Sequence, residues 1–132
     1  MGTRCADRVQ EAMESRLEDL RDFRNRLNSG DDDAIDDAME EFSWYGLCFD
    51  YVEAGTFTDQ DEPYFRWQIS WGGPSDEFRF FLQNGDELQR VEYWFLDWFD
   101  GACREIDEEI VNDIWESFLL PSAQCLLDAH QI

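Results

Sequence analysis

Lysine is absent from this chain, and its ten basic residues are all arginines, set against 32 aspartates and glutamates. The formal net charge at pH 7 is therefore −22. A protein that binds nucleic acid directly needs a basic face to meet the phosphates. So little positive charge excludes that class, and a single histidine, His130, leaves almost no imidazole chemistry.

Long apolar runs and cysteine motifs are missing as well. No stretch of about 18 apolar residues exists to span a membrane, and the charged N-terminus lacks the apolar core of a signal peptide. We therefore expect a cytoplasmic protein. The cysteines form no C-x-x-C pair, which predicts reduced thiols packed as small apolar residues rather than a zinc site. They are Cys5, Cys48, Cys103 and Cys125.

Catalytic signatures are also absent from the sequence. The chain contains no G-x-S-x-G, no G-x-x-x-x-G-K-[ST] and no G-x-G-x-x-G motif. Carboxylates are so numerous that no spacing singles out an acid–base pair. Residues 59–62 begin as D-x-D but lack the glycine and the distal glutamate of an EF-hand loop. These absences predict no enzyme, no cofactor and no specific metal site.

The chain is instead rich in aromatic residues and in segregated charge. Its 132 residues are 43% hydrophobic and 16% aromatic, so residues 1–132 are expected to fold as a single domain rather than to stay disordered. Residues 1–28 hold six acids and six arginines, which cancel. The sequence therefore predicts a charge-neutral helix within residues 1–28, joined to a polyanionic body, residues 29–132.

Two helices are expected toward the N-terminus. Apolar residues recur at helical steps over residues 3–28, and opposite charges three or four residues apart support that helix through ion pairs. The expected pairs are Arg8/Glu11, Glu18/Arg21 and Asp22/Arg26. Residues 31–42 form the second expected helix, with Ser29 as its cap and an apolar stripe facing the core. The stripe comprises Ile35, Ala38, Met39 and Phe42.

Alternating apolar and polar residues, separated by turn signals, predict four strands. They lie at about 44–53, 64–71, 77–83 and 89–99, with turns at 72–75 and 84–86. Residues 105–119 are expected to form a helix that Pro121 ends, and residues 122–129 a last short helix. The order α-α-β-β-β-β-α predicts an α+β fold in which a four-stranded antiparallel meander sheet packs against the helices.

Acidic residues concentrate in three segments. Residues 31–41 hold seven carboxylates within about 16 Å of helix, or about one charge per 2.4 Å, compared with about one per 1.7 Å in duplex DNA. A nucleic-acid-binding protein would meet there a potential like that of its own ligand. The candidate partner-binding residues are Asp31, Asp32, Asp33, Asp36, Asp37, Glu40, Glu41, Asp59, Asp61, Glu62, Glu105, Asp107, Glu108, Glu109, Asp113 and Glu116.

Solubility alone is an alternative role for the negative charge, because acidic surfaces are often simply solvated. A lysine-free, Asp-rich composition also suits an organism with high internal salt, and a different protein-binding role is a third alternative. Two features favour nucleic-acid mimicry over these alternatives. The negative charge is segregated along the chain, and residues 1–28 have a balanced composition. A compositional bias shared by a whole proteome would have made residues 1–28 acidic as well.

The acidic run Asp31–Glu41, the small size and the net charge make this chain similar in type, though not in a shared motif, to a known class of proteins. The chain resembles the small acidic nucleic-acid mimics of phages and conjugative elements, the anti-restriction and anti-CRISPR inhibitors. Residues 64–82 with 92–101 are also similar to small proteins of plasmids and integrative elements. The first resemblance implies binding to the basic DNA- or RNA-binding groove of a host defence complex, such as a CRISPR effector or a restriction enzyme, with no catalytic residue carried over.

The resulting hypothesis is an anti-CRISPR-type inhibitor that blocks target DNA binding. An immunity protein that neutralises a nuclease toxin would use the same electrostatic attraction, so the sequence leaves that alternative open. It also leaves open an anti-restriction role. Helix 3–28 either completes the core or pairs with a second copy in a homodimer.

Overall fold

The computed structural model describes residues 5–58, 60–71, 74–83, 87–97 and 100–130. Helices α1 (Cys5–Leu27) and α2 (Asp32–Tyr45) precede a five-stranded sheet, and a helical segment follows it. The strands are antiparallel and adjacent in chain order. They are β1 (Cys48–Val52), β2 (Tyr64–Ser70), β3 (Pro74–Gln83), β4 (Glu87–Asp97) and β5 (Asp100–Ile106). The α+β arrangement matches the prediction, except that the sheet has five strands rather than four.

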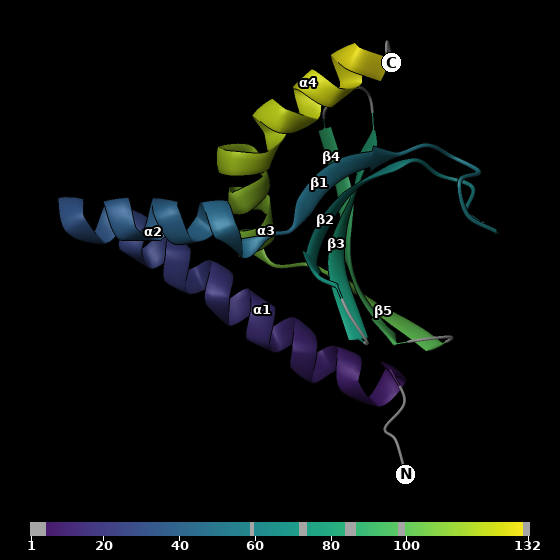
Figure 1. Ribbon diagram of the computed structural model, residues 1–132, viewed down its shortest axis with the longest axis horizontal. Helices are drawn as coiled ribbons and strands as arrows, with labels where there is room; N and C mark the ends of the chain where they lie inside the picture. The colour runs from purple at the N-terminus through teal and green to yellow at the C-terminus, as the bar shows by residue number, and fades with distance from the viewer. Residues whose placement is uncertain (1–4, 59, 72–73, 84–86, 98–99, 131–132) are drawn as a thin grey trace.

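The helices gather on one face of the sheet (Figure 1). Helix α1 packs on β4 and β5, and α2 packs against α1. Aromatic rings fill the space between the layers, where Trp115 stacks on Phe80 with ring centroids 4.9 Å apart. Phe78 and Tyr93 beside them are fully buried. One continuous apolar cluster thus joins both layers, and α1 contributes Val9 to it.

The fifth strand was not predicted. Residues 100–106 pair with β4 from Asp97↔Asp100 to Val91↔Ile106, where the sequence pattern predicted the start of a helix at residue 105. This edge strand buries Ile106 but leaves residues 100 and 101 exposed, so it lacks the regular apolar alternation that marks a strand. Glu105 therefore lies in a strand, and not in a helix as expected. Of the expected turns at 72–75 and 84–86, residues 72–73 and 84–86 fall outside the described residues. Residues 74 and 75 begin β3, so the first turn was predicted two residues too long.

Helix α2 is longer than expected and has a different cap. Its last turn includes Trp44 and Tyr45, for which a strand was predicted because aromatic residues favour strands. Tertiary packing overrides that preference, since the Tyr45 ring meets the Phe23 ring edge-on at 5.2 Å. At the other end Asp31, rather than Ser29, is the N-cap, and its carboxylate accepts a hydrogen bond from the backbone N–H of residue 33 at 3.0 Å.

The apolar stripe of α2 faces the core only in part. Ala38 is fully buried, and Phe42 packs against the core cluster, as predicted. Met39, by contrast, is 53% exposed, so its predicted place in the core was wrong. The buried face of α2 is therefore narrower than the sequence pattern indicated.

The C-terminal segment is one bent helical path. Helix α3 (Glu109–Ile114) passes into a π-helical turn, η1 (Trp115–Leu119), and then into α4 (Leu120–His130). Pro121 does not end the helix as predicted, because it lies in the first turn of α4. A proline ring carries no N–H and crowds the preceding turn, and the wider π-helical turn before it relieves that misfit.

The cysteines are free thiols, but they are not packed uniformly as expected. Cys5 is buried, whereas Cys48 and Cys125 are exposed and Cys103 is half-buried. Only the first of them therefore serves as a small apolar core residue.

One internal ion pair ties α1 to the sheet. Asp76 is 3% exposed, and its carboxylate accepts two hydrogen bonds from the Arg16 guanidinium, at 2.7 and 3.1 Å. It also accepts from Ser70 and, at 2.5 Å, from the Tyr93 hydroxyl. Burial and this hydrogen bond raise the pKa of Tyr93, so its hydroxyl remains the donor at neutral pH. A buried negative charge is therefore fully paired inside the fold.

Gly46, between α2 and β1, has no room for a side chain. A Cβ there would lie 2.2 Å from Nε1 of the buried Trp67 indole. We expect Gly46→Ala to lower the free energy of unfolding by about 2–3 kcal/mol through overpacking, measured by urea denaturation. In Gly101→Ala the new Cβ would meet the movable Cδ2 of Leu96 at 2.9 Å, and we expect a loss below about 1 kcal/mol. Equal losses in the two variants would contradict this steric cause.

Candidate functional site

The arginines of α1 point toward the rest of the protein. Arg8 binds Asp97 at 2.9 Å, Arg16 binds Asp76 at 2.7 Å, and Arg24 binds Asp113 at 2.8 Å. Arg21 and Arg26 reach Glu108 at 3.4 Å and Glu41 at 2.5 Å. Of the three ion pairs expected within the helix, the structure forms Asp22–Arg26 at 3.0 Å. The other two are replaced by these contacts with the body, so those two predictions were wrong.

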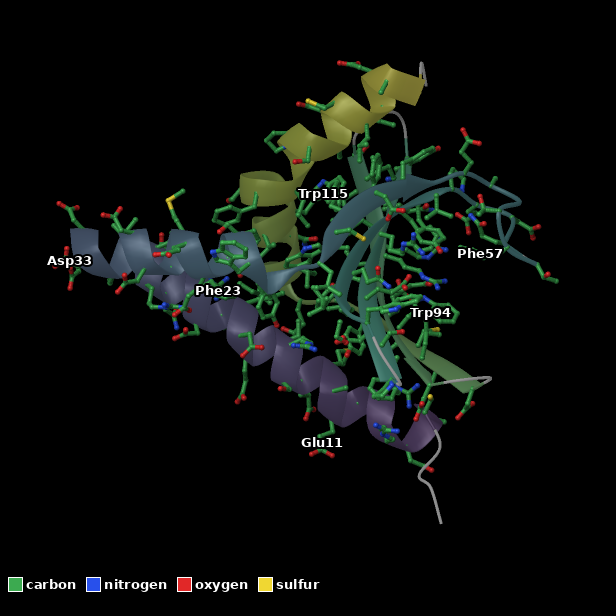
Figure 2. All side chains as sticks on the ribbon, in the orientation of Figure 1. Glu11, Phe23, Asp33, Phe57, Trp94 and Trp115 are labelled. Atoms are coloured by element: carbon green, nitrogen blue, oxygen red, sulfur yellow. The ribbon has the colours of Figure 1, made fainter. Side chains whose placement is uncertain are left out.

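Five of the six acids of α1 are consequently left on its outer face. Asp7, Glu11, Glu14, Glu18 and Asp22 follow one another at steps of four, three, four and four residues, and all are exposed. This spacing keeps them on one side of a helix, opposite the buried core residues. They span about 22 Å of helix axis. Figure 2 shows Glu11 pointing away from the sheet.

Helix α2 carries the second row of carboxylates. Asp32, Asp33, Asp36, Asp37 and Glu40 are exposed, and none of them pairs with an arginine in the described part of the chain. Together with Asp7, Glu11, Glu14 and Glu18 they form what we call the α1–α2 acidic surface. The two helices are joined through residues 28–31 (Figure 1).

Two candidate residues of the acidic run form contacts within the protein instead. Asp31 caps α2, and Glu41 accepts a 2.5 Å hydrogen bond from Arg26. That hydrogen bond lowers the pKa of Glu41 and is the main reason that the pKa of Arg26 is raised. Glu41 therefore shares the positive charge of Arg26 with Asp22 and contributes less to the outward field than the unpaired acids of α2.

A groove of about 450 Å³ runs between the two helices. Asp22 and Glu40 line it from opposite sides, and Trp44 stands at its margin with 79% of its surface exposed. Tyr45 also lines the groove and donates a 2.7 Å hydrogen bond to Asp19. Arg26 lines the groove too and binds Asp22 and Glu41, which leaves Asp19 and Glu40 as the lining acids that pair with no arginine among the described residues. An exposed indole beside the Glu40 carboxylate suits a cationic side chain, which gains both Coulombic and cation–π attraction.

The remaining candidate residues lie elsewhere on the molecule. Asp61 and Glu62 belong to the loop between β1 and β2, at the opposite end from α2 (Figure 1), and Glu62 is bound by Arg90 at 2.9 Å. Hydrogen bonding from Arg90 lowers the pKa of Glu62. Asp59 lies outside the described residues. The structure thus separates the loop acids from the α1–α2 acidic surface.

The segment 105–116 is divided between three kinds of structure. Glu105 lies in β5, Asp107 and Glu108 connect that strand to α3, and α3 itself begins at Glu109. Arg21 and Arg24 of α1 neutralise Glu108 and Asp113. The exposed members that pair with no arginine among the described residues are Glu105, Asp107, Glu109 and Glu116.

Sequence reasoning missed the acidic row on α1. Equal numbers of acids and arginines in residues 1–28 suggested a neutral helix. Net charge does not show, however, that the arginines point toward the protein and the acids toward solvent. The available signal was the helical spacing of the acids, which places them opposite the buried residues Val9 and Leu20.

No group of three or more His, Cys, Asp or Glu side chains among the described residues is arranged to hold a metal ion. None of the helices that those residues form is long and apolar enough to cross a membrane. Comparison with family models, with curated proteins and with solved structures finds no match for this chain.

Proposed function

We propose that this protein is a nucleic-acid mimic, a cytoplasmic inhibitor whose α1–α2 acidic surface occupies the basic DNA- or RNA-binding groove of a host defence complex such as a CRISPR effector. The observation that carries the proposal is the division of charge on α1. Its arginines are bound inward to the body, and five of its six carboxylates are exposed to solvent.

Charge density supports the comparison with a phosphate backbone. The five free carboxylates of α2 extend over about 12 Å of helix, or about one charge per 2.4 Å. Duplex DNA has about one per 1.7 Å of its axis. A basic groove meeting this row encounters a field of similar strength, which favours fast and salt-sensitive association.

Rigid presentation of the charges supports it as well. On the inner side of α2, Phe42 stacks on Phe118 with centroids 4.3 Å apart, and Ala38 is fully buried. The Asp31 cap fixes the first turn of the same helix. Backbone held in this way loses little conformational freedom on binding, so more of the electrostatic attraction is retained as affinity.

Trp44 is the residue of this region that we expect to contribute most to binding. Large aromatic residues dominate the energetics of many protein interfaces, and this indole is 79% exposed at the edge of the α1–α2 groove. We expect an arginine or lysine of the partner to contact Trp44 and Glu40, because Glu40 pairs with no arginine among the described residues.

A displacement experiment tests the proposal. Lysate of the organism that carries the gene is passed over immobilised duplex DNA at low salt, and the resin is then washed with this protein. We expect nucleic-acid-binding proteins to be released at micromolar concentrations of the protein, because both polyanions compete for the same basic groove. The release should weaken sharply as ionic strength increases, since screening shortens the Debye length.

An inert protein of similar negative charge, added at the same concentration, is the control for nonspecific ion exchange. If this protein releases no more than that control, the acidic surface serves solvation rather than recognition, and the proposal is wrong.

A further inference from the structure

The face of the sheet away from the helices carries its own layer of side chains. Arg66, Arg79 and Arg90 lie there, each bound to a carboxylate: Asp50 at 2.7 Å, Glu77 at 2.7 Å and Glu62 at 2.9 Å. Figure 2 shows Trp94 and Phe57 on this side of the sheet, opposite Trp115. The function proposed for the α1–α2 acidic surface does not involve these side chains.

A cavity of about 390 Å³ opens on that face, between the β1–β2 loop and strands β2 to β4. This volume lies within the range of small-molecule sites, about 300–1,000 Å³. Four of its eleven lining residues are aromatic, and the other seven are charged or polar. The rings are Phe57, Tyr64, Phe81 and Trp94.

The guanidinium groups in the cavity already contact aromatic rings and carboxylates of the protein itself. Arg79 lies 3.9 Å from the Trp94 ring centroid and 4.7 Å from that of Tyr64, and Arg90 lies 3.8 Å from that of Phe81. The carboxylates nearby are those of Asp61, Glu62 and Glu92 along the walls, with the buried Glu77 bound to Arg79. Carboxylates therefore outnumber cations, which disfavours an anionic ligand.

Tyr64 is the one buried side chain of the cavity whose polar group lacks a partner among the described residues. It is 2% exposed, and its hydroxyl is fully buried. Burial raises the pKa of Tyr64, so the hydroxyl is neutral and offers both a donor and an acceptor. A buried hydroxyl without a partner is costly and rare in folded proteins. Because the hydroxyl oxygen has less than 1 Å² of accessible surface, a ligand atom in the cavity would satisfy it once the side chains that cover it shift.

We propose that this cavity binds a small planar heteroaromatic molecule, uncharged or cationic, whose ring lies among Phe57, Phe81 and Trp94 and whose edge hydrogen-bonds to the Tyr64 hydroxyl. Aromatic walls favour a flat ring through stacking. The excess of carboxylates selects against phosphorylated or carboxylated compounds of the same shape. This site is independent of the acidic surface and of its partner.

Adenosine and adenosine monophosphate are a suitable pair of probes, because they share one ring system and differ in negative charge. Binding is followed by tryptophan fluorescence and by NMR shifts of the cavity residues. We expect adenosine to bind at millimolar or lower concentration and the monophosphate to bind at least about tenfold more weakly, a difference of about 1.4 kcal/mol. Equal or tighter binding of the monophosphate would overturn the proposed ligand class.

Tyr64→Phe tests the hydroxyl itself. We expect this variant to weaken adenosine binding at least about fivefold and to raise the melting temperature of the free protein by about 3–5 °C, because an unsatisfied buried group is removed. Tyr45→Phe is the matched control. It deletes a satisfied hydroxyl, bound to Asp19 at 2.7 Å, so it should lower the melting temperature and leave adenosine binding unchanged.

Two results would refute the proposal. One is the absence of adenosine binding at millimolar concentration in the wild-type protein. The other is a Tyr64→Phe variant that melts lower than wild type and binds adenosine equally well, since that result assigns the hydroxyl to an ordered water and not to a ligand.

Discussion

Replacing the five free carboxylates of α2 with amides is expected to lower the affinity for a basic partner at least about 100-fold at low salt. The variant combines Asp32→Asn, Asp33→Asn, Asp36→Asn, Asp37→Asn and Glu40→Gln. Each exposed charge at an interface contributes about 0.5–1 kcal/mol, and about 2.7 kcal/mol corresponds to a hundredfold change. The measurement is competition with immobilised duplex DNA for the proteins that the wild type releases.

The fold should survive this change. Asp36, Asp37 and Glu40 stand three or four residues from other acids of α2, and like charges at those spacings repel. Removing them should keep the melting temperature equal or raise it. Glu41 is left unchanged because its ion pair with Arg26 helps to join α2 to α1.

A matched variant separates position from net charge. Five acids with no arginine partner in the described structure are neutralised on the rest of the body, which gives the same change in net charge. They are Asp61, Glu105, Asp107, Glu109 and Glu116. We expect less than about a tenfold loss of affinity here, from long-range attraction alone. Losses of equal size in both variants would assign binding to overall charge and contradict a defined site.

Asp76→Ala is expected to cause the largest loss of stability of any single acid replacement, about 3–5 kcal/mol. It would leave the Arg16 guanidinium and the Tyr93 hydroxyl buried without their partner. A protein of this size has a total stability of about 5–15 kcal/mol, so the variant lies near the limit of folding. The loss is measured as the shift of the urea midpoint.

Asp97→Ala is the control for that variant. Asp97 also pairs with an arginine of α1, Arg8 at 2.9 Å, but both side chains are partly exposed. Solvent-exposed pairs contribute about 0–1 kcal/mol. If Asp76→Ala does not fold, Asp76→Asn provides a milder test. A cost for the Asp76 variants no greater than that of Asp97→Ala would contradict the stabilising role of the buried network.

Local patterns predicted much of this fold. The helices α1 and α2 and the strands β2, β3 and β4 appear where apolar periodicity placed them, because each buries one face against a common core. The prediction failed at elements that lack that periodicity. Strand β5 is an edge with few buried residues, and the last turn of α2 is helical because Tyr45 packs on Phe23. Both depend on contacts distant in sequence.

The candidate site, like the fold, could be predicted from the sequence only in part. Exposure of the α2 acids follows from one helical period and was predicted. The partners of the α1 arginines could not be found in that way, because Asp76, Asp97 and Asp113 lie more than fifty residues further along the chain. The burial of Asp76 on β3 was equally hidden, since only the register of β3 with β4 brings it to Tyr93.

A mimic must occupy the same site on its partner as the nucleic acid does. The most direct measurement is equilibrium binding of this protein to one purified protein released from DNA, at several concentrations of duplex DNA. We expect mutual exclusion, with the apparent dissociation constant rising in proportion to the DNA concentration once the DNA is in excess. A complex that contains the partner, the DNA and this protein together would contradict mimicry.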